Sequence, residues 1–535
     1  MPGPYHSPGV YVEEVDRGSK PIEGVGTAVA AFIGFTKTYP KDVDDPLYDK
    51  SDPLGVKPRR ITNWGQFETS YGGFVPGAML PHAVYGYFNN GGGTCYVVRI
   101  PHNGEDAEQP RRAIPATGRR ELETLHVRAL DPSTRTEVVV ELPAAPAEGE
   151  GGQPPGTFTL KVRQDSKDVE TFPDLTMGRG ARGVETVVNT ESTRIRVETP
   201  TTPGVPVAER VPAAGTYPLE PAKPKAGTVS SSDFEGSESE RTGIRGLTIA
   251  EDTTMIAVPD LETVATRNGE VDLGLYQAVQ MSLIDHCESA RSRMALLDAP
   301  PGMGPQRVQE WRRQVLYDAQ FATLFYPHIE IANPLADRSN GDDKRLTVPP
   351  SGHVAGIWAR NDANRGVWKA PANEVVRGAL NVETPITMRE QGPLNLDGIN
   401  CIRAFGTAGI RLWGARTLSS NPSWRYINVR RLFNFVEQSI ERGTQWVVFE
   451  PNDKDLWERV KRTLYAFLVG LWRQGALVGA TPAQAFYVKC DEETNPPDQV
   501  DQGQLVVEVG IAPVKPAEFV IFRVSQWQAG AGTAE

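Results

Sequence analysis

The chain has 535 residues, of which 39% are apolar and 23% charged. This length exceeds what one core supports, since single cores stop growing near roughly 250–300 residues, so two to four domains are expected. The net charge of −11 argues against nucleic-acid binding by the electrostatics of the whole molecule. Direct membrane insertion is also not expected, because the apolar stretch 466–472 is far shorter than the roughly 20 residues of a span.

Four cysteines lie far apart in the sequence, and no two form a CxxC pair. A long chain with so few cysteines is not a disulfide scaffold, so we expect reduced, mostly buried thiols. The first residues, MPGPYHSPGVYVEEVD, lack a basic region followed by an apolar one, and no signal peptide is predicted. Folding and assembly in the cytoplasm are the resulting expectation.

Composition changes along the chain. Residues 1–104 are rich in glycine, aromatic and β-branched residues, whereas residues 143–156 resemble a flexible loop and seven prolines fall between Pro200 and Pro224. Such proline density excludes long helices. Short alternating runs indicate strands and a small β domain within 105–240. These runs are at 137–142, 158–162 and 194–198.

Strands and helices alternate from residue 250 onward. Apolar runs at 255–260, 293–300 and 321–327 predict strands, and apolar residues at helical spacing lie between them. Such alternation predicts a mainly parallel sheet covered by helices. The predicted fold is therefore a multidomain α/β body with a mixed, mainly parallel sheet, a small β-rich inserted domain and extended terminal strand arms.

The C-terminal third continues the alternation. Asn428 is predicted to cap a helix that Gly443 ends, and a strand is predicted at 445–451. The helix at 453–474 has a wide apolar stripe at a period of 3.6 residues, a cap at Asn452 or Asp453, and a stop at Gly475. Further strands are predicted at 486–490, 505–513 and 518–524.

No enzyme signature is present: the sequence has no GxxxxGK[ST], HExxH or GxSxG. The glycines at 91–93 precede a strand, which favours a tight turn over a phosphate-binding loop. His286 and Cys287 are adjacent on a helix, so their side chains diverge. Asp298 ends a strand where α/β enzymes place ligands, but no second catalytic group accompanies it.

A metal centre is equally unsupported. Cys490 is followed by three acidic residues, but a soft thiolate beside hard carboxylates is a poor ligand set, and consecutive residues do not easily converge. We therefore predict no catalytic, cofactor-binding or metal-binding residues, no cofactor, and no enzymatic activity.

The two ends of the chain are the unusual features. Residues 8–15 have a short strand pattern followed by a tether with glycines and prolines, and residues 519–524, after Pro513 and Pro516, are apolar on both faces. A strand with two apolar faces must be covered on both. Either both segments complete sheets of their own chain, or they are donated as strands to neighbouring subunits.

Long segments of the chain closely resemble contractile tail sheath proteins of phages, R-type pyocins and phage-like extracellular contractile injection systems. The resemblance spans 1–104 and about 245–527, and 105–240 corresponds to a variable surface insertion. The segments that carry it are SPGVYVEE (7–14), VPPSGHVAGIWARNDANRGVWKAPAN (348–373), GINCIRAF (398–405), WGARTLSSNPSWRYINVRRLFNFVEQSIERGTQWVVFEPND (413–453), LWRQGALVGATPAQAFYVKCDEETNPP (471–497) and GIAPVKPAEFVIFRV (510–524).

The resemblance implies a structural subunit that polymerises as stacked hexameric rings around an inner tube. The sheath would contract from a metastable extended state and drive the tube through a target envelope. The implied partners are the chain itself, an inner tube protein, and baseplate and terminal cap proteins. The final location would be a virion, a released particle or the producing cytoplasm. The alternatives are a non-contractile component of a tail-like particle and a surface glycan-binding protein.

The resemblance also assigns residues. The inter-subunit strand arms would contain Val10, Tyr11, Val12, Val15, Phe519, Val520, Ile521, Phe522 and Val524, and the candidate inner-tube contact is Lys454, Arg459, Lys461 and Arg462. The expected parts are an N-terminal arm and tether (1–26), the first part of the sheath body (27–104), the insertion (105–240), a central α/β domain (241–415), a C-terminal domain (416–512) and a C-terminal arm (513–535).

Overall fold

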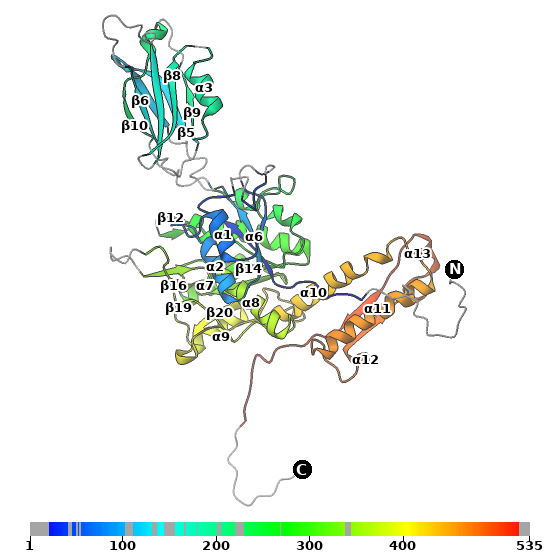
Figure 1. The fold of residues 1–535 in the computed structure, drawn as a ribbon. Coiled ribbons are helices and arrows are strands. Elements are labelled where there is room, and N and C mark those ends of the chain that lie inside the picture. The colour runs from blue at the N-terminus through cyan, green and yellow to red at the C-terminus, as the bar shows by residue number, and fades with distance from the viewer. Residues whose placement is uncertain are drawn as a thin grey trace, which may run out of the picture. The chain divides into compact units, whose positions relative to one another are not determined.

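The computed structural model forms two compact units (Figure 1). Unit 1 combines Met1–Ile100 with Ser231–Glu535, and unit 2 is Pro101–Ser230. The residues that the structure describes are 21–40, 45–49, 52, 55–101, 111–130, 136–143, 156–164, 167–178, 180–200, 205–219, 229–267, 269–336 and 344–523.

A nine-stranded sheet is the centre of unit 1. Its order is β18-β21-β20-β15-β14-β11-β1-β3-β2, and the pairs from β20 to β3 are all parallel. The antiparallel strands are at the two edges. The mixed, mainly parallel sheet predicted from the sequence is thus confirmed. The strands are β1 (Val29–Gly34), β2 (Arg59–Ile61), β3 (Thr94–Arg99), β11 (Met255–Ala257), β14 (Met294–Asp298), β15 (Ala322–Tyr326), β18 (Glu374–Val375), β20 (Ile399–Ala404) and β21 (Ile410–Leu412).

Helices cover the sheet. Every residue of β14 and β15 is buried, as strands covered on both faces must be. Helix α6 packs against β14, while α2 and α8 pack against each other and against β1. The main helices of the body are α1 (Trp64–Tyr71), α2 (Leu80–Asn90), α6 (Leu273–Ala290), α7 (Pro305–Val315), α8 (Ser351–Arg365) and α9 (Met388–Leu396).

Two glycines bring α2 and α8 into close contact. A Cβ at Gly352 would lie 2.3 Å from the Cα of Ala83, and a Cβ at Gly356 would lie 2.4 Å from the carbonyl oxygen of Tyr87. Both obstacles are backbone atoms, so larger residues would force the helices apart. Helix α8 also contacts β14, β11 and β1, which are interior strands of the sheet.

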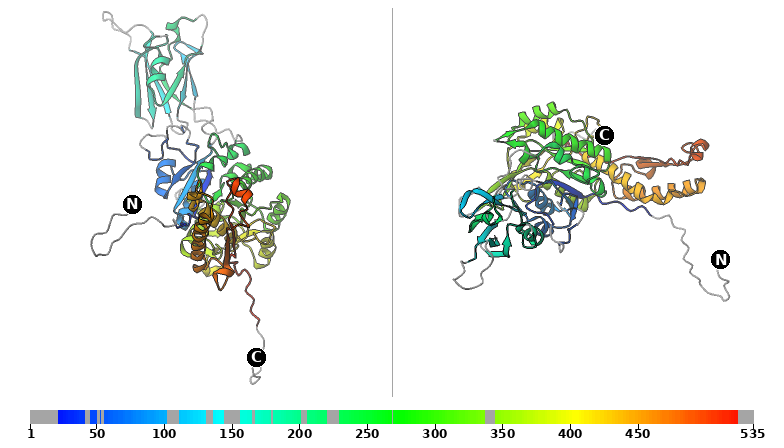
Figure 2. Two further views of the ribbon diagram at one scale, coloured as in Figure 1. Left: turned by 90° about the vertical axis from the view of Figure 1, so that its right-hand side faces the viewer. Right: turned by 90° about the horizontal axis from the view of Figure 1, so that it is seen from above.

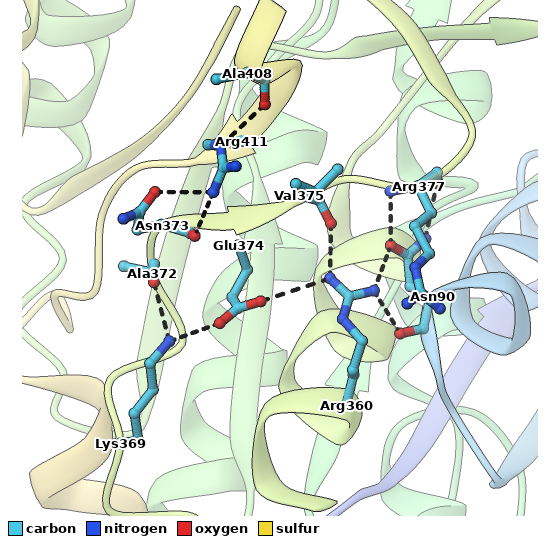
Figure 3. A network of polar contacts seen from close by, with 10 residues as sticks. All are labelled: Asn90, Arg360, Lys369, Ala372, Asn373, Glu374, Val375, Arg377, Ala408 and Arg411. Atoms are coloured by element: carbon cyan, nitrogen blue, oxygen red, sulfur yellow. Dashed lines mark hydrogen bonds and ion pairs between the residues drawn. The ribbon is translucent and has the colours of Figure 1, made fainter. Parts of the chain in front are cut away.

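A polar network closes the β18 edge of the sheet (Figure 3). Arg360 of α8 donates hydrogen bonds to the carbonyl oxygens of Asn90 (2.8 Å) and Val375 (2.7 Å). Lys369 pairs with Glu374 at 2.7 Å. The edge strand is therefore fixed to α2 and α8 by side chains, which is one way in which proteins protect a sheet edge.

Unit 2 contains two antiparallel sheets, and the strands predicted from its alternating runs are present. One sheet has the order β10-β6-β7-β8 and the other β4-β5-β9, and helix α3 (Val184–Glu191) packs with them into one apolar core. The strands are β4 (Arg111–Ala116), β5 (Arg119–Ala129), β6 (Thr136–Glu141), β7 (Thr157–Gln164), β8 (Lys167–Thr176), β9 (Ile195–Glu198) and β10 (Gly215–Pro218).

Unit 2 interrupts the sheet of unit 1. The chain leaves that sheet after β3 and returns to it at β11, and both of these strands pair with β1. The sheet therefore forms from sequence segments on both sides of the insertion.

A C-terminal lobe follows the body. Helix α10 leads out of the body toward α11, which packs against a two-stranded sheet (Figures 1 and 2). Asp453 caps α11 by accepting a hydrogen bond from the amide of Leu456 (2.8 Å), and Gly475 follows in the left-handed region, both as predicted. The elements are α10 (Ile427–Gly443), α11 (Lys454–Arg473), α12 (Pro482–Ala485), β22 (Phe486–Lys489), α13 (Pro497–Asp501) and β23 (Glu508–Ile511).

Three local predictions are wrong. Residues 445–451 form a short 3₁₀ helix, η4 (Gln445–Val447), and a turn in which Phe449 has a φ of 67° and is fully exposed. Asn428 does not cap α10, which begins after Tyr426, because its amide holds other segments. The described part of 518–524 contains no strand, and no strand among the described residues pairs with it.

Candidate functional site: the arm roots and the C-terminal lobe

The predicted arm residues differ in what the structure describes. Val10, Tyr11, Val12, Val15 and Val524 lie outside the described residues. Phe519, Val520, Ile521 and Phe522 are described, and their exposed fractions range from 68% to 84%. A surface segment rarely exposes four consecutive apolar side chains to this extent, and such a patch marks a site of interaction with a partner.

The lobe contains a sheet of only two strands. β22 and β23 pair antiparallel, and among the described residues neither pairs with a third strand. The inner face packs into the cores that contain Leu468 and Leu464 of α11. On the outer face Tyr487 is 58% exposed and stands opposite Gly510, where a Cβ would lie 2.2 Å from the tyrosine ring. The sheet is thus supported from one face, and no third strand extends it within the described residues.

Residues 21–27, which we name the N-terminal root, lie along α10. Ile22 packs beside Gly443, and Gly24 lies against the ring of Phe435. The amide of Val25 donates a hydrogen bond to the Ser439 hydroxyl (3.2 Å). The second half of the predicted tether is therefore packed against the helix rather than free.

A buried ion pair ends the N-terminal root. Arg431 of α10 binds both carboxylate oxygens of Asp362 (2.9 and 2.5 Å) and donates to the carbonyl of Thr27 (2.9 Å). The Thr27 hydroxyl donates to the same carboxylate (2.7 Å), and the guanidinium lies over the ring of Trp358 at 4.7 Å. Such bidentate, stacked arginine contacts fix direction as well as distance.

Residues 513–518, the C-terminal root, end in a second clamp. Arg416 binds the Glu518 carboxylate through two hydrogen bonds (2.8 and 2.7 Å), and Asn395 (2.6 Å) and Tyr426 (3.1 Å) donate to it as well. The Arg416 side chain is only 7% exposed. Burial alone would raise the pKa of Glu518, but the hydrogen bonds from Arg416 and Asn395 outweigh burial and lower it.

The C-terminal root is also held upstream of Glu518. Asn428 donates hydrogen bonds to the carbonyls of Val514 (3.0 Å) and Trp368 (2.9 Å). Pro513 forms a bridge with Leu477. The apolar residues 519–522 therefore leave the body from a fixed position.

The candidate tube-contact residues lie on the polar face of α11, and most of them are paired. Lys454 contacts Glu492 (2.5 Å), Arg459 contacts Glu450 (3.0 Å), and Lys461 contacts Glu458 (2.5 Å). Arg462 donates to the backbone carbonyl of Glu458 (3.2 Å). Glu458 of α11 itself, together with Glu450 and Glu492 of neighbouring segments, thus reduces the basic excess that the helix sequence suggested.

The carboxyl ends of the body strands contain buried charges. Asp298 accepts a hydrogen bond from the amide of Ser351 (2.9 Å), and burial raises its pKa to about 6. His328 lies 3.0 Å from Glu262 and 3.7 Å from Glu383. Burial alone would lower the pKa of His328, but these carboxylates raise it to about 9. Each member has a structural partner, so the cluster is explained as an internal ion network.

The cysteines and the possible metal ligands bear on the expectations from the sequence. All four cysteines are free thiols and buried. Within the described ranges, no group of three or more potential ligands has a geometry that would hold a metal ion. No helix in those ranges combines the length and apolar character needed for a membrane crossing.

Sequence reasoning did not single out the residues of the two clamps. Arg416, Glu518, Asp362 and Arg431 are ordinary charged residues whose partners lie 69 and 102 positions away. Each of them, however, falls within a segment that carries the family resemblance. That overlap was the only signal that marked them.

Comparison with known families covers the region of both clamps. The model of the phage tail sheath protein central domain matches residues 255–418, and the model of the phage tail sheath C-terminal domain matches residues 419–526. The two matches follow each other without a gap. The N-terminal half and unit 2 lie outside them.

Curated relatives extend the similarity. A tail sheath protein of Burkholderia phage BcepMu is 25% identical over 93% of this chain and 92% of the phage protein. A prophage major tail sheath protein of Pseudomonas aeruginosa strain UCBPP-PA14 is 28% identical over 47% of this chain, a match that spans 63% of the relative, less than two thirds of its length.

Solved structures show the same fold. The helical sheath of the anti-feeding prophage in its contracted state has a TM-score of 0.57 and 24% identity, with 98% of this chain and 99% of that chain covered. With both sheath domain models matched in order and a relative aligned along nearly its whole length, the chain belongs to the contractile tail sheath protein family.

Proposed function

We propose that the chain is the structural subunit of a contractile sheath, and that it acts by polymerising rather than by catalysis. It assembles as stacked hexameric rings around an inner tube and contracts from a metastable extended state. Two observations on the single chain carry the proposal: the apolar segment 519–522 is exposed, and the sheet of β22 and β23 has no third strand among the described residues. Membership of the sheath family supports it.

In this proposal the arms are donated strands. Residues 8–16 and 517–525 of one copy add to sheets of its neighbours, and the edges of β22 and β23 are suitable acceptors. Each added backbone hydrogen bond contributes roughly 0.5–1.5 kcal/mol net. Apolar residues such as Phe519 and Ile521 would gain the cover that they lack in a single copy.

Strand donation is suited to contraction. Neighbouring subunits must move relative to each other without separating, and a short chain connection permits this while the bodies repack. The free energy comes from interfaces gained in the contracted form. A gain of a few kcal/mol per subunit becomes a large total over many copies, so contraction requires no nucleotide.

The inner-tube contact is assigned to the polar face of α11 at Lys454, Arg459, Lys461 and Arg462. A contact that must break during firing should be polar and weak. The near balance of charge on this face, with Glu450 and Glu492 beside the cations, fits a weak contact better than a strongly basic surface would.

Further partners follow from the same proposal: baseplate and terminal cap proteins bind the ends of the cylinder. Structures similar in fold include a baseplate of the anti-feeding prophage. The assembly functions in a virion, a released particle or the producing cytoplasm, without a cofactor.

Electron microscopy of the purified chain tests the proposal. Wild-type protein should form hollow helical cylinders, whereas variants that lack 1–16 or 519–535 should stay as soluble subunits with an unchanged far-ultraviolet spectrum. The Lys515→Ala variant, which alters an exposed side chain in the C-terminal root, is the matched control and should form normal cylinders. Normal cylinders from both truncated variants would contradict strand donation.

A further inference from the structure

The roots of both arms converge on one short segment. Residues 416–431, which we name the arm hub, connect β21 to the first turns of α10. Arg416 and Tyr426 bind Glu518, and Asn428 binds the carbonyl of Val514. Three residues of the hub therefore hold the C-terminal root, in addition to Asn395 and Leu477 outside the hub.

The N-terminal root reaches the same segment. Arg431 donates to the carbonyl of Thr27 and binds Asp362, which also accepts a hydrogen bond from the Thr27 hydroxyl. Arg431 follows Asn428 by less than one turn of α10. The terminal roots, nearly 500 residues apart in sequence, thus meet on neighbouring side chains.

The hub is rigid by its own contacts. Arg416 and Tyr426 form an antiparallel bridge, and the Thr417 hydroxyl donates to the carbonyl of Trp424 (2.7 Å). The guanidinium of Arg430 lies over the rings of Trp424 (4.4 Å) and Phe321 (4.7 Å). A segment closed on itself in this way transmits a displacement instead of absorbing it.

The hub is also seated on the central sheet. Asn400 of β20 accepts a hydrogen bond from the amide of Arg416 (2.7 Å) and donates to its carbonyl (2.8 Å). The side-chain amide of Asn400 also donates to the carbonyl of Leu324 in β15 (3.2 Å). The hub is therefore attached to β20 and β15, and a movement of the hub is a movement relative to these two strands.

We infer that the arm hub couples the two arms mechanically. A neighbour that pulls on one arm displaces its root, and the hub passes that displacement to the root of the other arm, which is attached to a different neighbour. Contraction would then spread from subunit to subunit through the hubs. This inference rests on the proposed function, but the coupling itself is a property of the single chain.

Hydrogen exchange on the full-length soluble chain tests the coupling. Glu518→Gln removes the charge of the clamp and keeps the shape of the side chain. Local opening should then speed amide exchange in 514–518 and also in 22–28, by about threefold or more in each. Because coupling is reciprocal, Thr27→Val should speed exchange in 514–518 as well. Lys515→Ala should leave both roots unchanged.

Two results would contradict the proposed coupling of the two roots through the hub. Glu518→Gln that loosens only 514–518, or Thr27→Val that loosens only 22–28, would show two independent clamps. Neither result depends on whether cylinders form, so a failure of the proposed function is recognised separately, by wild-type protein that makes no cylinders.

A second measurement uses assembled sheaths. Tyr426→Phe removes one hydrogen bond to Glu518 and leaves the donated strands intact, so cylinders should form. After a contraction trigger, the fraction of cylinders that stop partly contracted should rise at least several-fold over wild type. Ile402→Val, a core change in β20 at a residue outside the hub and both roots, is the control for loss of stability alone. Equal behaviour of the two variants would contradict transmission through the hub.

Discussion

The central sheet of the body and the small sheet of the lobe differ in how their faces and edges are covered. In the body, helices cover both faces of β14 and β15, and side chains such as Arg360 fix the β18 edge. In the lobe, β22 and β23 are covered on one face by α11 and have no third strand in the described chain. A sheet of two strands is marginally stable in water unless it packs against a helix, as β22 does against α11. Within the described chain the body sheet is thus covered on both faces, whereas the lobe sheet is covered on one face and ends at two strands.

This comparison predicts that changes in the body affect folding, whereas changes on the lobe sheet affect assembly. The largest effect is expected for Trp358→Ala. Trp358 is completely buried, and its ring lies beneath the guanidinium of Arg431. The loss of packing should lower the free energy of unfolding by about 3–5 kcal/mol. Urea titration followed by circular dichroism measures it, and a loss below about 1 kcal/mol would mean that the site is not a packed core.

The pH dependence of the body should reflect His328. Its pKa in the folded chain is about 9, above the ordinary value of 6.5. Protonated His328 therefore stabilises the fold fully below about pH 6.5, and this contribution is lost as the pH rises through about 9. Between pH 7 and 9 the loss should approach about 2–3 kcal/mol.

The matched variant for this prediction is His328→Gln, whose stability should change less between pH 7 and 9. The comparison separates His328 from the buried cysteines, because burial raises the thiol pKa of Cys287 and Cys401 to about 12. The unfolded chain then loses thiol protons before the folded one in both proteins. Parallel pH profiles for wild type and variant would contradict the assignment.

A smaller effect is expected at the start of α11. Asp453→Ala removes the side chain that accepts a hydrogen bond from the amide of Leu456, and caps of this kind contribute about 1 kcal/mol. Asp453→Asn keeps the acceptor and should recover most of the loss. Urea titration of the two variants checks the prediction, which fails if both lose the same free energy.

The smallest effect on folding, and the sharpest test of the comparison, is expected for Tyr487→Ala. The ring lies on the exposed face of β22, so its removal should cost about 0.5 kcal/mol or less. Cylinder formation should nevertheless fall strongly, since the ring stands on the exposed face of the sheet to which an arm would add under the proposed function. Normal assembly of this variant, measured by sedimentation, would remove the distinction between the two sheets.

The elements that the sequence predicts well are those whose own pattern determines them. The helix from Lys454 to Arg473 follows from its apolar period, its aspartate cap and Gly475. The parallel strands of the body follow from short apolar runs between helical segments. In both cases the cover for the apolar residues comes from the same chain.

The predictions that fail depend on distant or absent partners. The apolar run at 445–451 has a strand composition, yet Val448 and Phe449 are exposed and lie in a turn. Asn428 has the character of a helix cap, but its amide is used by Val514 and Trp368. The clamp of Arg416 and Glu518 joins residues 102 positions apart, which no local pattern reveals.

The position of unit 2 in the chain has a consequence for its replacement by another domain. Its two connections join β3 and β11, and β1 pairs with both of these strands through its own register. The sheet that supports the hub therefore does not depend on the identity of the inserted module. A different domain, or an affinity tag, placed between Pro101 and Ser230 should leave the machinery around Arg416 and Arg431 unaltered.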